Sequence, residues 1–216
     1  MLKTLYMLFT LICLDPMADS VTLDEKSWES LSYKNIPANK NIFSNNQLVI
    51  KVDSSAGPLI FPFEGPKDIK SLKVVGNIKG SLSLGNKVQG STEADDFIFR
   101  IGLVYQGDNT LNFFQQAIAP KWIKKLYSLA DQDQGVSNIH FYNLVSQKSL
   151  LGQKRSHPMS DLLIENFHTL KPVGPNFTLN VNQLPKGKVL ALWLSLDGDQ
   201  TQSKFEVTLK EITLNE

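Results

Sequence analysis

Short runs of alternating hydrophobic and polar residues recur along most of the chain, with turn-forming residues between them. Such an alternation, rich in Val, Ile, Phe and Thr, is typical of β-strands with one buried face. The runs are Trp28–Tyr33, Gln47–Asp53, Pro58–Glu64, Ser71–Gly85, Asp96–Tyr105, Asn138–Ser146, Asp161–Leu170, Asn176–Asn182, Lys188–Leu196 and Lys204–Leu214. Because Gly, Pro, Asn and Asp separate them, they predict an all-β sandwich or barrel.

Three of these runs differ in informative ways. In residues 176–182, apolar side chains alternate with polar ones, which predicts a strand with one face in water. Residues 188–196 are apolar on both faces, so we expect a central strand that is covered on both sides. In the last run the apolar positions change phase after Leu209, and this change predicts a β-bulge near Lys210–Glu211.

One segment, residues 109–131, has a helical period instead. Its apolar residues lie three or four positions apart, which predicts an amphipathic helix inserted between the two halves of the β domain. Asn109 or Thr110 can cap its start, and Gly135 follows its end. Pro120 predicts a kink or two short helices, and the unbroken phase of the stripe favours a kink. The stripe consists of Leu111, Phe114, Ile118, Trp122, Leu126 and Leu129.

The N-terminus has the pattern of a secretory signal peptide. One cation, Lys3, precedes an apolar run at residues 5–14, which is shorter than the roughly 20 residues needed to span a bilayer. The small residues of Ala18–Ser20 form a cleavage site. We therefore expect a signal peptide at residues 1–20, a single domain at residues 21–216, and a periplasmic or secreted protein.

Composition and cysteine content limit the class of protein further. The formal net charge is only +1, which argues against nucleic acid as a partner, because phosphate binding needs a concentrated basic face. Cys13 is the only cysteine and lies in the predicted signal, so an exported chain has no disulfide and depends on its core. Export of a chain without disulfides favours the bacterial periplasm as the location of the protein. Ile12 disfavours lipid attachment at Cys13, because lipid-attachment signals have a small residue at that position. If the N-terminal segment is not cleaved, it forms a buried first strand or an uncleaved anchor.

The C-terminal strand resembles the closing strand of galactose-binding-like jelly-roll domains. These domains commonly end in the pattern v-t-l-x-x-I-x-l, which is matched by Val207, Thr208, Leu209, Ile212 and Leu214. The chain is also similar to a group of uncharacterised bacterial secreted β-sandwich proteins. They share a D-D-F-x-x-R-I-x-L-V-Y strand, here Asp95–Tyr105, and a late D-x-D-x-T turn, here Asp197–Thr201. Over residues 28–214 the resemblance implies an antiparallel β-sandwich of jelly-roll type, and it implies a fold rather than a function.

The turn at Asp197–Thr201 is a candidate calcium site. Asp197, Asp199 and Thr201 occupy alternate positions and can direct several oxygens to one side, as Ca²⁺ requires. The helix-loop-helix calcium pattern is excluded, because its glycine and glutamate positions hold other residues. A sandwich-type site stays open if Asp95 and Asp96 of the segment "EADD" converge with the turn. A polar hairpin tip between two hydrophobic strands is the favoured interpretation.

Arg100 stands in an otherwise apolar strand. A buried unpaired charge costs several kcal/mol, so the guanidinium needs a partner if it is buried. It forms a structural ion pair with Asp95, Asp96 or the turn at Asp197 and Asp199, faces water, or holds an acidic ligand.

The sequence lacks three common signatures of metal, nucleophilic and phosphate sites. The three histidines, His140, His157 and His168, do not have the spacing of zinc ligands. Neither the G-x-S-x-G elbow nor the G-x-x-x-x-G-K-[ST] phosphate loop is present. Paired carboxylates have no spacing signature, so a polysaccharide hydrolase or lyase that uses "EADD" or "DGDQT" is an alternative function. No cofactor is expected unless the turn at Asp197–Thr201 binds calcium.

The helical segment has three interpretations. It can cover one open end of the sandwich, with its lysines in water. Trp122 and Tyr127, with Phe113 off the main stripe, can form a platform that stacks on sugar rings. Residues 120–127, where lysines lie among aromatic residues, can contact an anionic membrane surface. We predict a non-catalytic binding protein for carbohydrate or envelope glycan, with Arg100 as a further ligand contact, and an envelope protein-interaction module is the remaining alternative.

Overall fold

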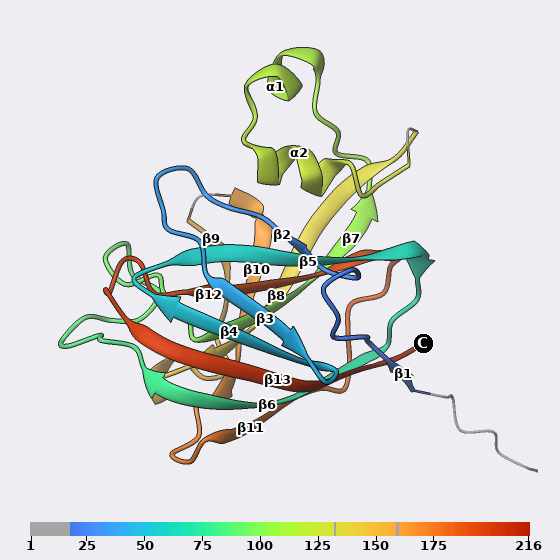
Figure 1. Cartoon of the computed structure of the whole chain (residues 1–216). Coiled ribbons are helices and arrows are strands. Elements are labelled where there is room, and N and C mark those ends of the chain that lie inside the picture. The colour runs from blue at the N-terminus through green and yellow to red at the C-terminus, as the bar shows by residue number, and fades with distance from the viewer. Residues whose placement is uncertain (1–17, 132, 159) are drawn as a thin grey trace, which may run out of the picture.

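The computed structural model describes residues 18–131, 133–158 and 160–216, which form two stacked β-sheets with a helical projection (Figure 1). The strands are β1 (Asp19–Ser20), β2 (Glu29–Ser30), β3 (Lys40–Ser44), β4 (Gln47–Asp53), β5 (Ala56–Lys67), β6 (Ser71–Ser81), β7 (Phe99–Gly107), β8 (Gly135–Val145), β9 (Lys154–His157), β10 (Ser160–Leu170), β11 (Asn176–Val181), β12 (Val189–Asp197) and β13 (Lys204–Asn215). The helices are α1 (Phe113–Ile118), α2 (Lys121–Tyr127) and the short 3₁₀ helix η1 (Lys148–Leu150).

The strands divide between a six-stranded and a seven-stranded sheet. The six-stranded sheet has the order β11-β6-β13-β4-β3, with β1 paired to β13, and the seven-stranded sheet has the order β2-β5-β12-β7-β8-β10-β9. The strand pairs are antiparallel except for β8 and β10, which run parallel. The predicted all-β fold, an antiparallel β-sandwich of jelly-roll type with a helical insertion, is confirmed, and the parallel pair is an addition to it.

The main core lies between the two sheets and is built from alternate residues of each strand. β11 has the predicted wet face, and every residue of β12 is buried, also as predicted. The predicted bulge in β13 is confirmed, because its register with β6 shifts between Leu209 and Glu211. The bulge brings Ile212 back to the side of the core after the change of phase.

A second apolar cluster covers the face of the seven-stranded sheet that is turned away from the six-stranded sheet. We call this side the outer face. Val104, Ile139 and Trp193 point outward from β7, β8 and β12, and Leu126 of α2 packs on them. Burial on both faces explains why β12 is a continuous apolar run.

The helical insertion differs from the expected single kinked helix. Pro120 separates α1 from α2, because it lacks the amide hydrogen that would continue the first helix. Asn112, and not Asn109 or Thr110, caps α1 through a capping box with Gln115. Asn109 instead forms a β-bridge with Val136 at the start of β8.

Other sequence expectations need local correction. The predicted strand at residues 28–33 is reduced to the two residues of β2, and β3 and β9 were not expected. The turn after Asp197 is not a hairpin tip, because β12 and β13 lie in different sheets and residues 198–203 cross between them.

The predicted signal peptide falls largely on residues outside the described ranges. The boundary after Ser20 therefore stays a prediction. Within the described part of the chain, Asp19 and Ser20 pair with Leu214 and Thr213 of β13. None of the helices in that part is long and apolar enough to cross a membrane.

Candidate binding site

Charged side chains meet on the outer face of the seven-stranded sheet, at the end distant from α2. β7 carries Arg100 and β10 carries Glu165, while Asp197 ends β12. Arg100 binds Asp197, and its Nη1 donates to Glu165 Oε1 over 3.2 Å. The exposed fractions of the three side chains are 11%, 6% and 0% for Arg100, Asp197 and Glu165. Of the alternatives that the sequence left open for Arg100, the structure has the structural ion pair, with Asp197 and also Glu165 as partners.

The same cluster continues to strand β9. Arg155 donates from Nε to Glu165 over 2.7 Å and from a terminal nitrogen to Asp95 over 2.7 Å. His157 Nε2 lies 2.8 Å from the other Asp95 oxygen. We call these six residues, Asp95, Arg100, Arg155, His157, Glu165 and Asp197, the charged cluster.

Opposite charges counter the effect of burial on the pKa of two members of the charged cluster, whereas burial raises the pKa of a third, Asp197. Burial lowers the pKa of Arg100, but Asp197, Glu165 and Asp95 raise it by more, so the guanidinium stays charged. Burial raises the pKa of Asp95, but the hydrogen bond from His157 and the charge of Arg100 lower it by more. The cluster therefore has the properties of a structural ion network.

The two acidic segments converge, which was the condition for a sandwich-type calcium site. Asp96 accepts hydrogen bonds from the Thr201 amide over 2.7 Å and from the Thr201 hydroxyl over 2.5 Å. The Asp95 amide donates to the side chain of Gln200 over 2.7 Å. Asp199 is half-buried, and burial, together with Asp96 and Asp197, raises the pKa of its carboxyl group.

Guanidinium groups already pair with two of the four carboxylates of the candidate calcium site. Arg100 binds Asp197, and Arg155 binds Asp95. Among the described residues, Asp95, His157 and Glu165 could offer ligand atoms within 4.8 Å of one another, but Arg155 is bonded to both of those carboxylates. A metal site there would have to displace a charged arginine.

We expect calcium to leave the thermal stability of the protein unchanged. A cation that binds only the folded state raises the melting temperature as its concentration exceeds its Kd. The measurement is a thermal melt in calcium chloride and in excess chelator. A rise with calcium that is lost in Asp199→Asn would contradict this expectation and assign the turn as a metal site.

The aromatic residues predicted to form a sugar platform lie in different surroundings. Trp122 packs edge-on against Tyr33 and Trp193, with ring centroids 5.9 and 6.1 Å apart. Tyr127 packs against the same outer-face cluster and lines a cavity of about 390 Å³ beside α2. Phe113 lies on α1 and contacts Phe114, and Arg100 belongs to the charged cluster, so the four residues do not share one surface.

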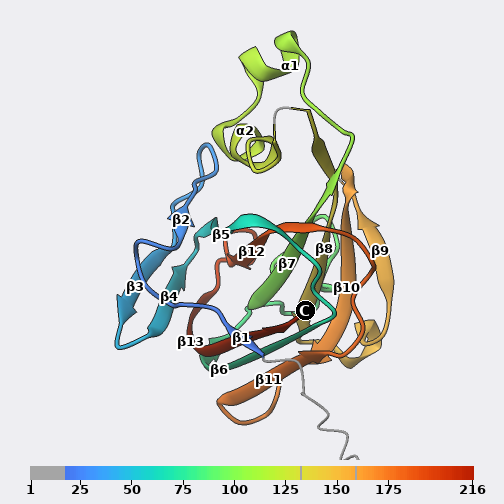
Figure 2. The same ribbon diagram turned by 90° about the vertical axis from the view of Figure 1, so that its right-hand side faces the viewer.

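A groove of about 610 Å³ opens between the edges of the two sheets. The six-stranded sheet ends at β11, and the other sheet continues past β8 to β10 and β9, as Figure 2 shows. The groove is therefore bounded by the uncovered inner face of β8, β9 and β10 and by the chain that follows β11. Its lining residues are His140, Tyr142, Lys154, Asn166, His168, Asn180, Val181, Asn182, Gln183, Leu184 and Pro185. We call it the inner-face groove.

Strand register explains why these side chains meet. Tyr142 pairs with Asn166 across β8 and β10, and Asn166 pairs with Lys154 across β10 and β9. On the other side Tyr142 pairs with Ile101 of β7, which is part of the main core. The row of paired residues Ile101, Tyr142, Asn166 and Lys154 thus changes from apolar to polar where the six-stranded sheet no longer covers it.

Neighbouring groups hold the walls of the groove in place. Tyr142 packs edge-on against His168 at 5.7 Å, and Tyr105 packs edge-on against His140 at 5.3 Å. The Tyr105 hydroxyl donates to the Pro185 carbonyl over 3.1 Å and so fixes the loop after β11. These contacts preorganise the rings before any ligand arrives.

The inner-face groove is almost uncharged at neutral pH. Burial lowers the pKa of His140 and His168, and Lys154 lowers that of His140 further, so both rings are neutral. Burial raises the pKa of Tyr142 to about 12. Lys154 is the one formal charge among the described lining residues, and none of those residues is a carboxylic acid.

The sequence did not reveal this groove, because no short motif encodes it. Its only signal is polar residues at inward positions of β10, such as Asn166 and His168, where a covered strand would carry apolar ones. Two of the three histidines, His140 and His168, line the groove, and His157 belongs to the charged cluster. The three therefore do not form one site.

No protein-family model matches the sequence, and neither does any curated protein. Among solved structures, the chain is similar to the family 11 carbohydrate-binding module of the cellulosomal cellulase Lic26A-Cel5E of Clostridium thermocellum. The identity is 8%, the TM-score is 0.44, and the match covers 94% of this chain and 96% of that chain. A xylan-binding module, CBM86, from Roseburia intestinalis has 9% identity, a TM-score of 0.36, and coverages of 92% and 95%.

The carbohydrate recognition domain of Emp46p, in its metal-free form, has 12% identity, a TM-score of 0.38, and coverages of 88% and 88%. Identities and TM-scores this low describe only a general likeness of folds, so we argue the function from the residues of the groove.

Proposed function

We propose that this protein binds carbohydrate in the inner-face groove without cleaving it. The observation that carries the proposal is the chemistry of the lining. Asn166, Asn180, Asn182 and Gln183, which have side-chain amides, line the groove together with His140, Tyr142 and His168, and no described carboxylate is among them. Specific small-molecule sites combine a concave surface with a few convergent polar groups in this way.

A neutral, hydroxyl-rich ligand fits this lining best. An amide group both donates and accepts hydrogen bonds, so it can serve two neighbouring sugar hydroxyls at once. The partly exposed rings of His140 and His168 offer flat faces for the C–H side of a sugar ring, while the Tyr142 ring is buried and packs against His168. Phosphate ligands would need more cations than the single Lys154, and lipids would need a more apolar wall. The open shape suits a glycan chain that lies along the surface.

The absence of catalysis is part of the proposal. Glycosidases use two carboxyl groups on either side of the scissile bond. The acidic residues of "EADD" and "DGDQT" lie at the charged cluster, where Asp95, Asp96 and Asp197 accept hydrogen bonds from Arg155, Thr201 and Arg100. This supports binding over hydrolysis, and release of reducing ends from a bound glycan would contradict it.

We also propose that the chain is exported after removal of residues 1–20. The pattern of Lys3, the apolar run and Ala18–Ser20 supports this, and glycans of the cell envelope would then be within reach of the groove. N-terminal sequencing of protein recovered from the periplasm or medium tests it. A chain that retains Met1 inside the cell would contradict the export.

Replacing Asn180 and Asn182 with alanine is expected to weaken glycan binding by about tenfold or more. Each amide hydrogen bond contributes about 0.5–1.5 kcal/mol net, and 1.4 kcal/mol corresponds to a factor of ten in Kd. Both side chains are exposed, so the fold should not change. The measurement is a neutral-glycan array, followed by calorimetric titration of the best array ligand.

Thr178→Ala is the matched control for this double variant. Thr178 lies on β11 with the same exposed orientation as Asn180, but it does not line the groove. The control should bind like the unchanged protein. Equal affinity in the double variant, with an unaltered melting temperature, would remove the groove as the binding site.

A further inference from the structure

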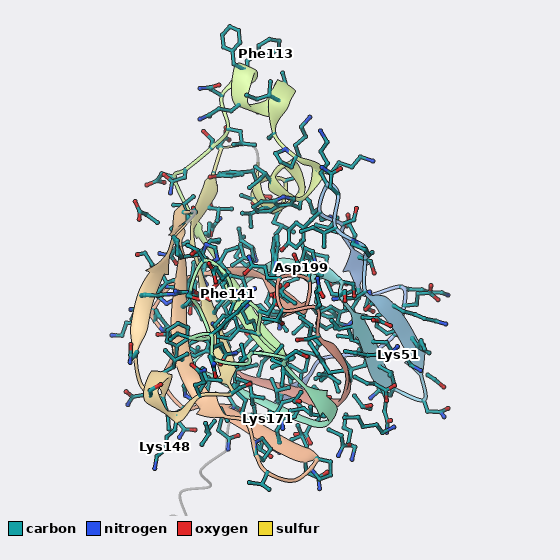
Figure 3. The ribbon with its side chains drawn as sticks, turned by 90° about the vertical axis from the view of Figure 1, so that its left-hand side faces the viewer. Lys51, Phe113, Phe141, Lys148, Lys171 and Asp199 are labelled. Carbon is teal, nitrogen blue, oxygen red and sulfur yellow. The ribbon has the colours of Figure 1, made fainter. Side chains whose placement is uncertain are left out.

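The tip of the helical insertion exposes three large apolar side chains. Phe113, Phe114 and Ile118 of α1 are 80%, 79% and 85% exposed. Figure 1 shows α1 at the outermost point of the projection, and Figure 3 shows Phe113 at the opposite end of the molecule from Lys148 and Lys171. We call these three side chains the apolar tip. Grouped exposure of this kind marks an interaction surface.

Local contacts hold the apolar tip in an ordered helix that faces water. The capping box between Asn112 and Gln115 closes the first turn of α1, and the Ala119 amide bonds back to the Gln115 carbonyl. None of the residues of α1 is buried. The core of the domain therefore gains nothing from Phe114 and Ile118, although their spacing continues the stripe that Trp122 and Leu126 bury.

Positive charge lies directly behind the apolar tip. Residues 109–130 contain three lysines and no aspartate or glutamate. Lys125 is paired with Glu29 at 2.6 Å, whereas Lys121 and Lys124 are exposed. Lys124 Nζ lies 3.4 Å from the Ala117 carbonyl of α1, so its charge is placed against the base of the tip.

We propose that the apolar tip inserts into the interface of a bilayer with anionic headgroups. A segment that presents aromatic and aliphatic groups outermost, with lysines behind them, matches the change from acyl chains to negative headgroups across that interface. The charge complementarity between Lys121 and Lys124 and anionic lipid selects this occupant. A second copy of this chain, of nearly neutral charge, offers no comparable attraction. The inference does not depend on glycan binding.

The test is flotation with phosphatidylcholine vesicles, with and without phosphatidylglycerol. We expect binding that requires the anionic lipid and weakens with salt. Phe113→Ser with Phe114→Ser should reduce vesicle partitioning by at least about tenfold, since the variant loses the two large apolar side chains that would be buried among the lipids. The matched control, Val88→Ser with Val173→Ser, also removes two exposed apolar side chains and should leave partitioning unchanged.

A second pair of variants tests the cationic part. Lys121→Gln with Lys124→Gln should reduce partitioning by about thirtyfold, which corresponds to about 2 kcal/mol for two lysines near the surface. Lys148→Gln with Lys171→Gln, at the far end of the molecule (Figure 3), should have no effect. Every variant carries the same residues 1–20, so any contribution of the apolar run at residues 5–14 stays constant.

Three results would overturn the proposal. The first is no flotation with anionic vesicles, and the second is unchanged flotation of the Phe113/Phe114 variant. The third is a dimer in sedimentation velocity that becomes a monomer in that variant, which would assign the apolar tip to a second copy of the chain. Melting temperatures should be equal across the variants, because the altered side chains are exposed.

Discussion

Replacing Arg100 with methionine is expected to lower the free energy of unfolding by about 3–5 kcal/mol, because it leaves Glu165 and Asp197 buried without their shared cation. Both carboxylates are almost inaccessible to water. Methionine keeps the length of the side chain, so the lost charge should dominate over lost packing against the Phe97 ring, which lies 4.8 Å from the guanidinium. Denaturant unfolding followed by tryptophan fluorescence measures the change.

Two controls separate this effect from general sensitivity to substitution. Lys79→Met removes the 3.2 Å ion pair with Glu206, but Lys79 is exposed, so we expect a loss below about 1 kcal/mol. Adding Glu165→Gln and Asp197→Asn to Arg100→Met should recover part of the loss, because neutral side chains cost less to bury. A loss of less than about 1 kcal/mol for Arg100→Met would show that the charged cluster is not structural.

Replacing Trp193 with alanine should lower the free energy of unfolding by about 3–5 kcal/mol. Trp193 is buried at the centre of the outer face, where it pairs with Gly102 of β7 and Ile60 of β5 and supports Trp122 of α2. Alanine would leave a cavity under α2, so the insertion should also detach more often. Trypsin should then cleave faster at Lys121, Lys124 and Lys125.

Trp122→Ala is the matched control for the cavity. Trp122 packs on the same cluster, but its ring is only partly buried, so its removal should cost less stability than removal of Trp193. It should nevertheless speed tryptic cleavage of α2, because it removes the packing of Trp122 against Trp193 that helps to hold α2 on the sheet. Equal losses of stability in the two variants would contradict the assigned order of burial.

A strand could be predicted where the order of apolar and polar residues within that strand determines which of its faces are buried. β11, β12 and the bulge in β13 are cases of this, since alternation, a continuous apolar run and a change of phase are local signals. The parallel pairing of β8 with β10 could not be predicted, because it joins strands that do not follow each other directly in sequence. The short strands β3 and β9 form hairpins with β4 and β10, but they were missed because their few residues show no apolar–polar alternation.

The helical stripe shows the limit of periodicity. Spacing identifies one face of a helix, but it does not say whether another element covers that face. Leu126 is covered by the seven-stranded sheet, and Phe114 and Ile118 of the same stripe are in water. The sequence therefore indicated a buried face where the structure has an exposed tip.

The candidate site was predicted in part. Asp197 was among the expected partners of Arg100, because both stood out as charges near apolar strands. Glu165 and Arg155, which complete the charged cluster, were not, because only the order β8-β10-β9 brings them there. The inner-face groove was missed for the same reason. Its amides and histidines form no sequence motif, and they line a groove only because one sheet extends beyond the edge of the other.

Mapping of amide resonances during titration with the best neutral glycan tests the central claim most directly. We predict shifts at His140, Asn166, His168 and residues 180–184, with none at the charged cluster or at Trp122 and Tyr127. Shifts confined to the outer face or to the helical insertion, or no glycan bound by the folded protein, would contradict the assignment of the inner-face groove as a carbohydrate site.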